Sequence, residues 1–482
     1  MIRKNSKYDK PKAGLLPFAS PRFRNLGIGL SRGSFHERKT KALSEIVHTL
    51  KDEINIIPAN IVYEIGDVQD AMNSFYAEKV DFVIVEFLSW SEDFAWIRFL
   101  RDMPDTPILL VNPVQGKMSF ETSIDEDDFI DFLCAGTLVG SLEAAGSIPR
   151  TGRNNIKILV GSRSENLKQI IEFSKAAKVR SVLLHSVFGM LANYNELMWA
   201  TYIDPYNLFA RIGPELKFIS YSEMKETVDK VTDSDVLEWK SDLLSKHKMQ
   251  ADIDEDKFLE SLRASIGLAR ISEQKGLDAL IFNDVDPAML NIFGLRPGFY
   301  HPSFNKNLSV MVPEADIGGG VISFILKMIS GKNVNFIEPF HIESDDNSFA
   351  GGHAGPNDHN DIEFQDQVII SKDIRFAKTN YKYAGAPFAW YRISPGRKTM
   401  AHFSENNGAY KLVTTLIDSL EGEHIFASYT HSIFKPVVPV KHLFQRLLDI
   451  GTTQHFAIVD GNYLSELSML AGIMRFEYHE II

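Results

Sequence analysis

The sequence contains a single cysteine, and this scarcity excludes two kinds of site. Cys134 lies in the apolar stretch 132–135, and one thiol can form neither an intramolecular disulfide nor a cysteine-based zinc site. A thiol in such surroundings is typically a buried, inert side chain and not a nucleophile. The chain therefore fits a reducing compartment.

The sequence also lacks an excess of basic charge and any long apolar run. Its net charge of -12 at pH 7 argues against a nucleic-acid partner, because phosphate binding needs a basic surface. The longest apolar candidate, 321–329, is about half as long as a membrane span. The basic N-terminus is interrupted by Pro17, Pro21, Arg22 and Arg24 where a signal peptide would be apolar. We therefore expect a cytoplasmic protein with no membrane partner.

Repeats and low-complexity tracts are absent, and the content of 44% hydrophobic and 24% charged residues is ordinary for a globular protein. A length of 482 residues predicts two to four domains. From about residue 25, short apolar runs alternate with helical patterns, which is typical of βαβ units and a parallel sheet. The runs that we interpret as the first strands are 26–30, 54–63, 81–87 and 107–112.

A second α/β pattern follows a stretch rich in Gly, Pro and Asn at 146–155, which is typical of a boundary. Strands are expected at 156–161 and 180–186, with a helix at 165–177 between them. Apolar residues at helical spacing over 257–275 lead into a further strand at 278–282. Beyond Gly331 the helical patterns become rare and strands dominate.

The expected fold class is therefore α/β, with two doubly wound, Rossmann-like domains followed by a mostly β, barrel-like C-terminal domain. We place an N-terminal arm at 1–22 and the three domains at 23–150, 151–325 and 326–482.

Residues with the chemistry of a site concentrate between 311 and 361. Glu314 ends an apolar run and Glu338 lies within one, and a carboxylate in such a place is costly unless it is paired, protonated or metal-bound. His353 lies among small residues, and His455 precedes a strand. Each of the four taken alone also fits an ordinary salt-bridged acid or a hydrogen-bonded loop histidine.

Taken together, two carboxylates and two imidazoles suit Mn²⁺, Co²⁺, Fe²⁺ or Mg²⁺, with coordination positions left for other oxygens. The three glycines at 318–320, which open a helix, could cradle a phosphate. They lack both the spacing and the lysine of a phosphate loop. A flexible start of the helix is therefore the favoured interpretation.

The order of these residues resembles the metal site of L-arabinose isomerases, within the L-arabinose/L-fucose isomerase superfamily. The intervals between the four residues are 24, 15 and 102 positions, which fit that family closely. The matching segments, in chain order, are Glu314 with Asp316 at the start of a helix, Phe336-Ile337-Glu338, Gly351-Gly352-His353, and His455 in a glycine-containing approach to a strand.

The resemblance implies a metal-dependent aldose–ketose isomerase that moves a proton between C1 and C2 of a sugar by a cis-enediol route. It assigns Glu314 and Glu338 as catalytic residues, the same two residues with His353 and His455 as metal ligands, and Asp316 as a partner of a ligand. It makes Mn²⁺ the expected metal. It further implies a homo-oligomer, commonly a hexamer, with active sites shared between subunits. Phe87 and Trp90 are then candidate contacts of the sugar, although core packing is the favoured interpretation of both side chains.

Two segments depart from the family, 111–115 and 354–358, and they leave the substrate open among pentoses, hexoses and deoxysugars. A metal-dependent sugar epimerase and a non-catalytic sugar-binding or regulatory protein remain as alternatives. Removal of the metal would abolish isomerisation but would leave the affinity of a simple sugar binder largely intact.

Overall fold

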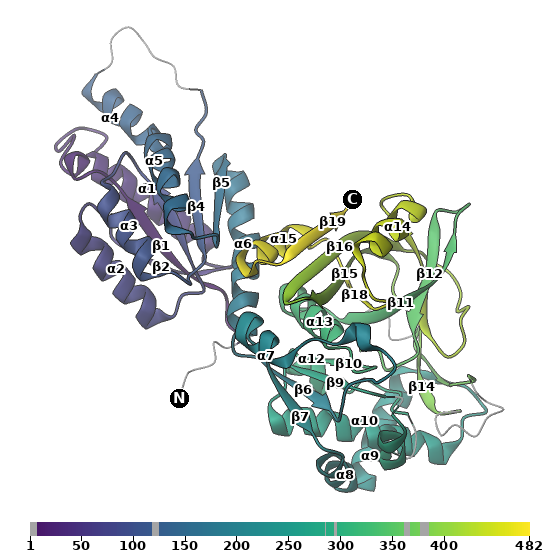
Figure 1. The fold of residues 1–482 in the computed structure, drawn as a ribbon. Helices are drawn as coiled ribbons and strands as arrows, with labels where there is room; N and C mark the ends of the chain where they lie inside the picture. The colour runs from purple at the N-terminus through teal and green to yellow at the C-terminus, as the bar shows by residue number, and fades with distance from the viewer. Residues whose placement is uncertain (1–6, 118–124, 285, 294–295, 361–366, 376–384) are drawn as a thin grey trace. The chain divides into compact units, whose positions relative to one another are not determined.

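A computed structural model describes residues 7–117, 125–284, 286–293, 296–360, 367–375 and 385–482. The chain divides into two compact units. Figure 1 colours the chain by residue number, from purple at the N-terminus to yellow at the C-terminus. The N-terminal unit comprises 1–182 and 465–475, and the larger unit comprises 183–464 and 476–482.

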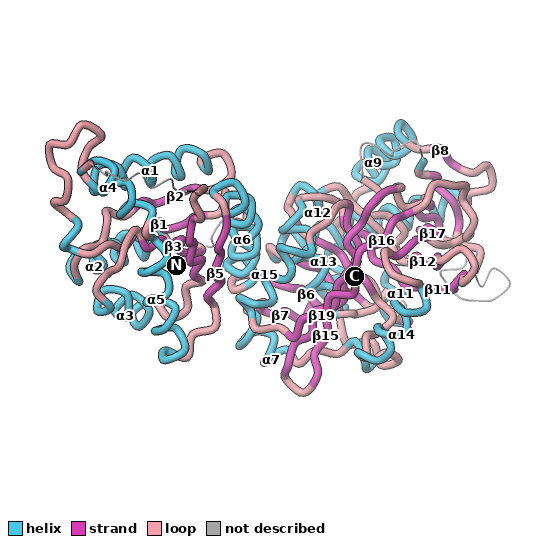
Figure 2. The backbone as a smooth tube through the Cα atoms, turned by 90° about the horizontal axis from the view of Figure 1, so that it is seen from above, coloured by secondary structure: helices cyan, strands magenta, loops and turns pink. Residues whose placement is uncertain are grey.

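The N-terminal unit is built on one parallel sheet of five strands in the order β2-β1-β3-β4-β5. Helices α2, α3 and α5 lie on one side of these strands and α1 lies on the other (Figure 2). The strands are β1 (Lys12–Phe18), β2 (Asn55–Pro58), β3 (Phe82–Phe87), β4 (Ile108–Pro113) and β5 (Ile156–Gly161). The helices are α1 (Phe35–Leu50), α2 (Ile65–Glu78), α3 (Asp93–Asp102), α4 (Glu126–Ala135), α5 (Thr137–Thr151), α6 (Arg163–Leu183) and α15 (Leu464–Met474).

The two central strands of this sheet form where the sequence is almost continuously apolar. Every residue of β3 is buried, as are the first five of β4, as expected of parallel strands covered on both faces. The Phe18 and Phe87 rings stack at 5.0 Å, and the Trp96 ring of α3 packs edge-on against both. The expected doubly wound sheet is thus confirmed.

The first strand of the sheet is not where the sequence placed it. The segment 26–30 forms turns, because Gly27 and Gly29 have φ angles of 74° and 88°, which a strand does not accommodate. The strand is Lys12–Phe18, within the expected arm, and it lies between β2 and β3. Residues 1–6 of that arm lie outside the described residues.

The strand expected at 156–161 is present as β5. β5 pairs with β4 along its whole length and so completes the first sheet. The expected strand at 180–186 is wrong, because α6 runs on to Leu183 and is followed by a turn. The N-terminal unit also includes α15, where Ser465 donates a hydrogen bond to Glu172 of α6 at 2.7 Å.

One helical stretch, Glu126–Thr151, is long and apolar enough to cross a membrane by length and composition. It consists of two helices, α4 and α5, separated at Gly136. α5 packs on the sheet, where a Cβ atom at Gly140 would lie 2.1 Å from the Ser89 carbonyl oxygen. This close contact accounts for the glycine at 140 by packing within the unit.

The larger unit contains a second parallel sheet, of four strands in the order β10-β9-β6-β7. Its strands are β6 (Val187–Leu191), β7 (Glu215–Ile219), β9 (Ala279–Phe282) and β10 (Val310–Val312). The helices of this unit are α7 (Pro205–Asn207), α8 (Tyr221–Asp229), α9 (Asp233–Lys246), α10 (Glu255–Lys275), α11 (Pro287–Phe293), α12 (Ser303–Lys306), α13 (Ile317–Ser330) and α14 (Val440–Ile450).

The remaining strands form a barrel-like sheet, which confirms the expected C-terminal architecture. Six strands follow one another in the order β15-β18-β11-β12-β17-β16, and β15 pairs again with β16 to close the ring. β19 adds to β16 in parallel, and a small separate sheet has the order β14-β13-β8. The bounds are β8 (Lys248–Met249), β11 (Val334–Glu343), β12 (Ser348–His353), β13 (Ile369–Lys372), β14 (Pro387–Trp390), β15 (Gly396–Asn406), β16 (Ala409–Ser419), β17 (Thr430–Pro436), β18 (Phe456–Asp460) and β19 (Glu477–Ile481).

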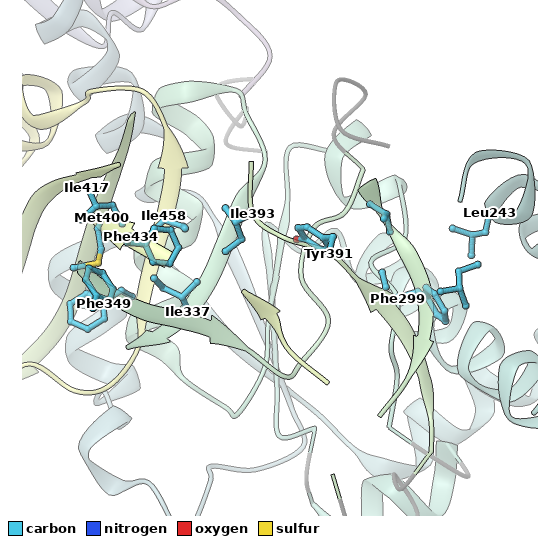
Figure 3. Close-up of a cluster of buried hydrophobic side chains, with 14 of the residues drawn as sticks. Leu243, Phe299, Ile337, Phe349, Tyr391, Ile393, Met400, Ile417, Phe434 and Ile458 are labelled. Atoms are coloured by element: carbon cyan, nitrogen blue, oxygen red, sulfur yellow. The ribbon is translucent and has the colours of Figure 1, made fainter. Parts of the chain in front are cut away.

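Apolar side chains of the barrel strands, of helices α9, α10 and α14 and of the small sheet form a continuous core, part of which Figure 3 shows. Ile337, Phe349 and Phe434 in this core are fully buried. At the edge of the barrel, α13 opens with glycines that pack closely, since a Cβ atom at Gly318 would lie 2.3 Å from the Phe403 carbonyl oxygen. One at Gly319 would lie 2.5 Å from the Phe336 ring. The expected flexible helix start is therefore wrong, and the glycines bring α13 close to the barrel.

Candidate metal centre

Glu314, Glu338, His353 and His455, which lie far apart in the sequence, form one cluster in the larger unit. One potential ligand atom from each lies within 4.8 Å of those of the other three. Within the part of the chain that the structure describes, no other group of His, Cys, Asp or Glu side chains gathers in this way. The cluster could hold a metal ion, and its donor set leaves the identity of that ion open.

Pairing of the barrel strands explains how three of these side chains meet. β11 lies between β18 and β12, with Ile337 opposite Phe456 and Glu338 opposite Gly352. His455 directly precedes β18, and His353 is the last residue of β12. Glu338 therefore lies between the two histidines. On the other side of β12, a Cβ atom at Gly352 would lie 2.1 Å from the carbonyl oxygen of Thr430 in β17. Only glycine therefore permits this spacing between β12 and β17.

Glu314 joins the cluster from the loop between β10 and α13, in a backbone conformation that is rare for residues other than glycine. Glu314 and Ala315 have φ angles of 61° and 58°. The amide of Glu314 donates to Asp284 at 3.1 Å, and its carbonyl accepts from Asn195 at 3.3 Å. Such strain persists only where the surroundings fix the conformation, and it is typical of functional sites.

His455 has carboxylates on both sides of its ring. Its Nδ1 lies 2.8 Å from an Asp316 oxygen, and its Nε2 lies 3.1 Å from Glu314 and 3.5 Å from Glu338. Burial alone would lower the pKa of His455, but hydrogen bonds to Asp316, Glu314 and Glu338 outweigh it and raise the pKa to about 11. The proton on Nε2 thus lies where two glutamates attract a cation, which fits a metal position.

Asp316 has two roles in this geometry. Its Oδ1 accepts from the amide of Gly319 at 2.8 Å and caps α13, while its Oδ2 lies 2.8 Å from His455. A carboxylate hydrogen-bonded to the outer nitrogen of an imidazole is the usual arrangement around a metal-binding histidine.

His353 is fully buried, and burial lowers its pKa to about 3, which keeps the ring neutral and able to bind a metal. Its Nε2 lies 3.6 Å from Glu314 and has no hydrogen-bond partner among the described residues. Its Nδ1 accepts from the amide of Gly355 at 3.0 Å. A neutral ring that binds a metal through Nε2 carries its proton on Nδ1. Nδ1 could then no longer accept from the Gly355 amide, so this amide would have to turn away. The unpartnered nitrogen nevertheless fits a cation.

Three side chains that were not predicted as site residues support the cluster. The Phe336 ring packs against the rings of His353 and His455 at centroid distances of 5.1 and 4.7 Å. His402, whose pKa burial lowers, lies with Nδ1 2.8 Å from the carbonyl of His455. Asp284 is buried in an ion pair with Arg296 and positions the Glu314 backbone. Phe336 belongs to the segment Phe336-Ile337-Glu338, which the sequence pointed to, whereas His402 and Asp284 carry no signal in a single sequence.

A cavity of about 400 Å³ is lined on one side by Ala315, the residue that follows Glu314 in the chain. Its other walls come from the segment after β6, including Tyr194, Trp199 and Tyr202. Asn195 lines the same cavity and also bonds the Glu314 carbonyl. The cavity is therefore linked to the cluster through the backbone of Glu314 and Ala315.

Three residues that the sequence singled out lie in the N-terminal unit. Phe87 is buried in the core, whereas Trp90 is only half-buried. Cys134 is half-buried, and burial raises the pKa of its thiol, so the thiolate form is disfavoured. This agrees with the expected unreactive thiol.

No protein-family profile matches the chain. Two curated proteins do, both named sulfoquinovose isomerase, from Priestia aryabhattai and from Priestia megaterium (strain ATCC 12872 / QMB1551). Each is 19% identical over 431 residues, which cover 88% of this chain and 90% of the relative. The chain is thus a distant relative, along most of its length, of proteins that bear the name of a sugar isomerase.

Proposed function

We propose that the protein is a metal-dependent aldose–ketose isomerase acting on a sugar. The observation that carries this proposal is the cluster of Glu314, Glu338, His353 and His455. The distant similarity to isomerases over most of the chain supports the reaction class.

The proposed reaction moves one proton between neighbouring carbons of the sugar. A divalent ion held by the four side chains would act as a Lewis acid toward the sugar oxygens and so ease removal of the carbon-bound proton. One of Glu314 and Glu338 removes the proton from C2 of the aldose and returns it to C1, which gives a cis-enediol route. The other carries the hydroxyl proton from O2 to O1. Both carboxylates are partly exposed, at 13% for Glu314 and 27% for Glu338, and so are accessible to a substrate.

The cavity beside Ala315 is the proposed position of the sugar. Its volume of about 400 Å³ lies within the range of small-molecule sites. The rings of Tyr194, Trp199 and Tyr202 offer apolar faces for the carbon-bound hydrogens of a sugar, and Asn193 and Glu196 line the same cavity with groups that can bind hydroxyls.

The finer assignments follow from the resemblance to L-arabinose isomerases. We propose Mn²⁺ as the metal, Asp316 as the partner that orients His455, a homo-oligomeric assembly and a cytoplasmic location. The relatives' name adds a sulfonated sugar to the candidate pentoses, hexoses and deoxysugars.

The test is to incubate metal-stripped full-length protein with each class of sugar, with and without Mn²⁺, and to measure ketose and epimer formation. We expect Mn²⁺-dependent ketose formation. Glu338→Gln should lower turnover by about 10²–10⁴-fold, because general acid–base catalysis contributes that much. Glu343→Gln, on the exposed end of the same strand, is the matched control and should retain activity.

Three results would contradict the proposal. Formation of an epimer in place of a ketose would show that the reaction is an epimerisation and not an aldose–ketose isomerisation. Sugar binding that is unaffected by metal removal, without turnover, would favour a binding protein. Failure to bind one metal ion per chain would contradict the assignment of the cluster as a metal site.

A further inference from the structure

The N-terminal unit has a topological switch point in its sheet that the proposed reaction does not use. Its strand β1 lies between β2 and β3, and the chain continues from β1 into α1 and from β3 into α3, which lie on opposite sides of the sheet (Figure 2). In open sheets of this kind, ligands bind outside the carboxyl ends of the strands at this switch point. The loops that begin at Ala19 after β1 and at Leu88 after β3 form this edge.

Hydrogen bonds fix these two loops to each other. The amide of Ser20 donates to the Ser89 hydroxyl at 3.1 Å, and that hydroxyl donates to the Trp90 carbonyl at 2.7 Å. The Ser20 hydroxyl accepts from the amide of Arg22 at 3.3 Å. The backbone that carries Arg22 and Trp90 is therefore held in place at the carboxyl ends of β1 and β3.

Two guanidinium groups lie over aromatic rings at this edge. The Arg22 guanidinium is 5.4 Å from the centroid of Trp90, and that of Arg24 is 5.3 Å from the centroid of Tyr63, which follows β2. Both arginines are exposed. A stacked guanidinium keeps its plane fixed and leaves its N–H groups free for a partner with two oxygens.

Neither arginine has an acidic partner. Among the described residues no carboxylate lies within 4.0 Å of Arg22 or Arg24. Two other arginines nearby do have acidic partners. Arg32 lies in the same connection between β1 and α1, and Arg38 lies in the first turn of α1. Each pairs with both Asp127 and Asp131. Two acids contact the aromatic residues of this edge: Asp67 accepts from the amide of Tyr63 at 2.9 Å, and Glu143 accepts from the Trp90 indole at 3.2 Å.

We infer that this edge binds a tetrahedral oxyanion, a sulfonate or a phosphate, carried by a sugar-sized ligand. Arg22 and Arg24 supply paired charge-assisted hydrogen bonds, and Trp90 and Tyr63 hold the two guanidinium groups in place. The choice of a sugar as the carrier rests on the proposed function, whereas the oxyanion site itself does not.

The test measures binding by calorimetry, with metal-stripped full-length protein so that turnover does not interfere. The probes are sulfoquinovose, glucose 6-phosphate and glucose. We expect one or both anionic sugars to bind at least about tenfold more tightly than glucose, because hydrogen bonds to charged groups exceed neutral ones by that margin. The tighter of the two identifies the anion.

The double variant Arg22→Gln with Arg24→Gln should lose this preference. Arg150→Gln, which removes an exposed arginine at the C-terminal end of α5, should keep it, and melting temperatures confirm that each variant folds. Equal binding of all three sugars by the unaltered protein, or an undiminished preference in the double variant, would overturn the inference. Both outcomes are independent of whether any sugar is isomerised.

Discussion

The candidate metal centre and the carboxyl edge of the N-terminal sheet present their binding groups in opposite ways. At the metal centre, His353 and His455 are buried, and each is in contact with the Phe336 ring. At the sheet edge, Arg22 and Arg24 are exposed and have only aromatic rings beneath them. The comparison teaches that changes to supporting residues should affect the first site strongly, whereas the second depends on the two arginines themselves.

The largest expected effect of a supporting residue is at Asp316, which does not belong to the cluster. Asp316→Asn keeps a side chain that caps helices well but removes the carboxylate that bonds His455. We expect a 10- to 100-fold loss of Mn²⁺ affinity, as for other partners of metal-binding histidines. Titration calorimetry measures it, with Asp345→Asn in the exposed β11–β12 turn as the control. Unchanged affinity would show that His455 does not need this partner.

An intermediate effect is expected where α13 packs against the barrel. Gly318→Ala places a methyl group 2.3 Å from the Phe403 carbonyl oxygen, and overpacking of this kind costs about 1–3 kcal/mol. Gly146→Ala in α5 of the N-terminal unit meets nothing within 4 Å and should be neutral or stabilise by about 0.4–1 kcal/mol. Urea unfolding monitors both. Equal effects of the two substitutions would mean that the close approach of α13 is not required.

A further prediction concerns the pH dependence of stability. Burial, with His247 nearby, lowers the pKa of His359 to about 3, against about 6.5 in an unfolded chain. The unfolded state then binds the proton more readily, so the contribution of His359 to stability is complete above pH 6.5 and is lost as the pH falls toward 3.

Thermal melts between pH 7.5 and 4 test this expectation. His359→Gln should flatten the dependence by up to about 1.4 kcal/mol per pH unit. His48→Gln, on the exposed face of α1, should leave the dependence as it is. An unchanged slope in His359→Gln would show that other groups dominate acid unfolding.

The sequence predicted most reliably those elements in which burial and pattern agree. Continuous apolar runs identified β3 and β4 because both faces of a central parallel strand are covered. β1 was missed because its apolar run is short, contains Pro17 and follows a basic terminus. The turns at 26–30 were predicted as a strand because the segment is apolar. Its two glycines, Gly27 and Gly29, adopt positive φ angles that an apolar pattern does not reveal.

The same distinction applies to the metal centre. The spacing of the four charged or imidazole residues identified them, and the structure brings all four together; their metal-binding and catalytic roles stay predictions. Asp284 and His402 could not be found, because they act through contacts between segments far apart in the chain. Such contacts exist only once the strands have paired.

The return of the chain to the N-terminal unit as α15 has a consequence for dividing the molecule. A fragment that ends at residue 182 lacks the helix whose Ser465 bonds Glu172 and whose Glu466 pairs with Lys175 at 3.7 Å. Such a fragment would expose the surface of α6 that this helix covers. The missing piece is a continuous segment, so a synthetic peptide of residues 465–475 should restore the fragment by complementation, in the way that split reporter proteins are reassembled.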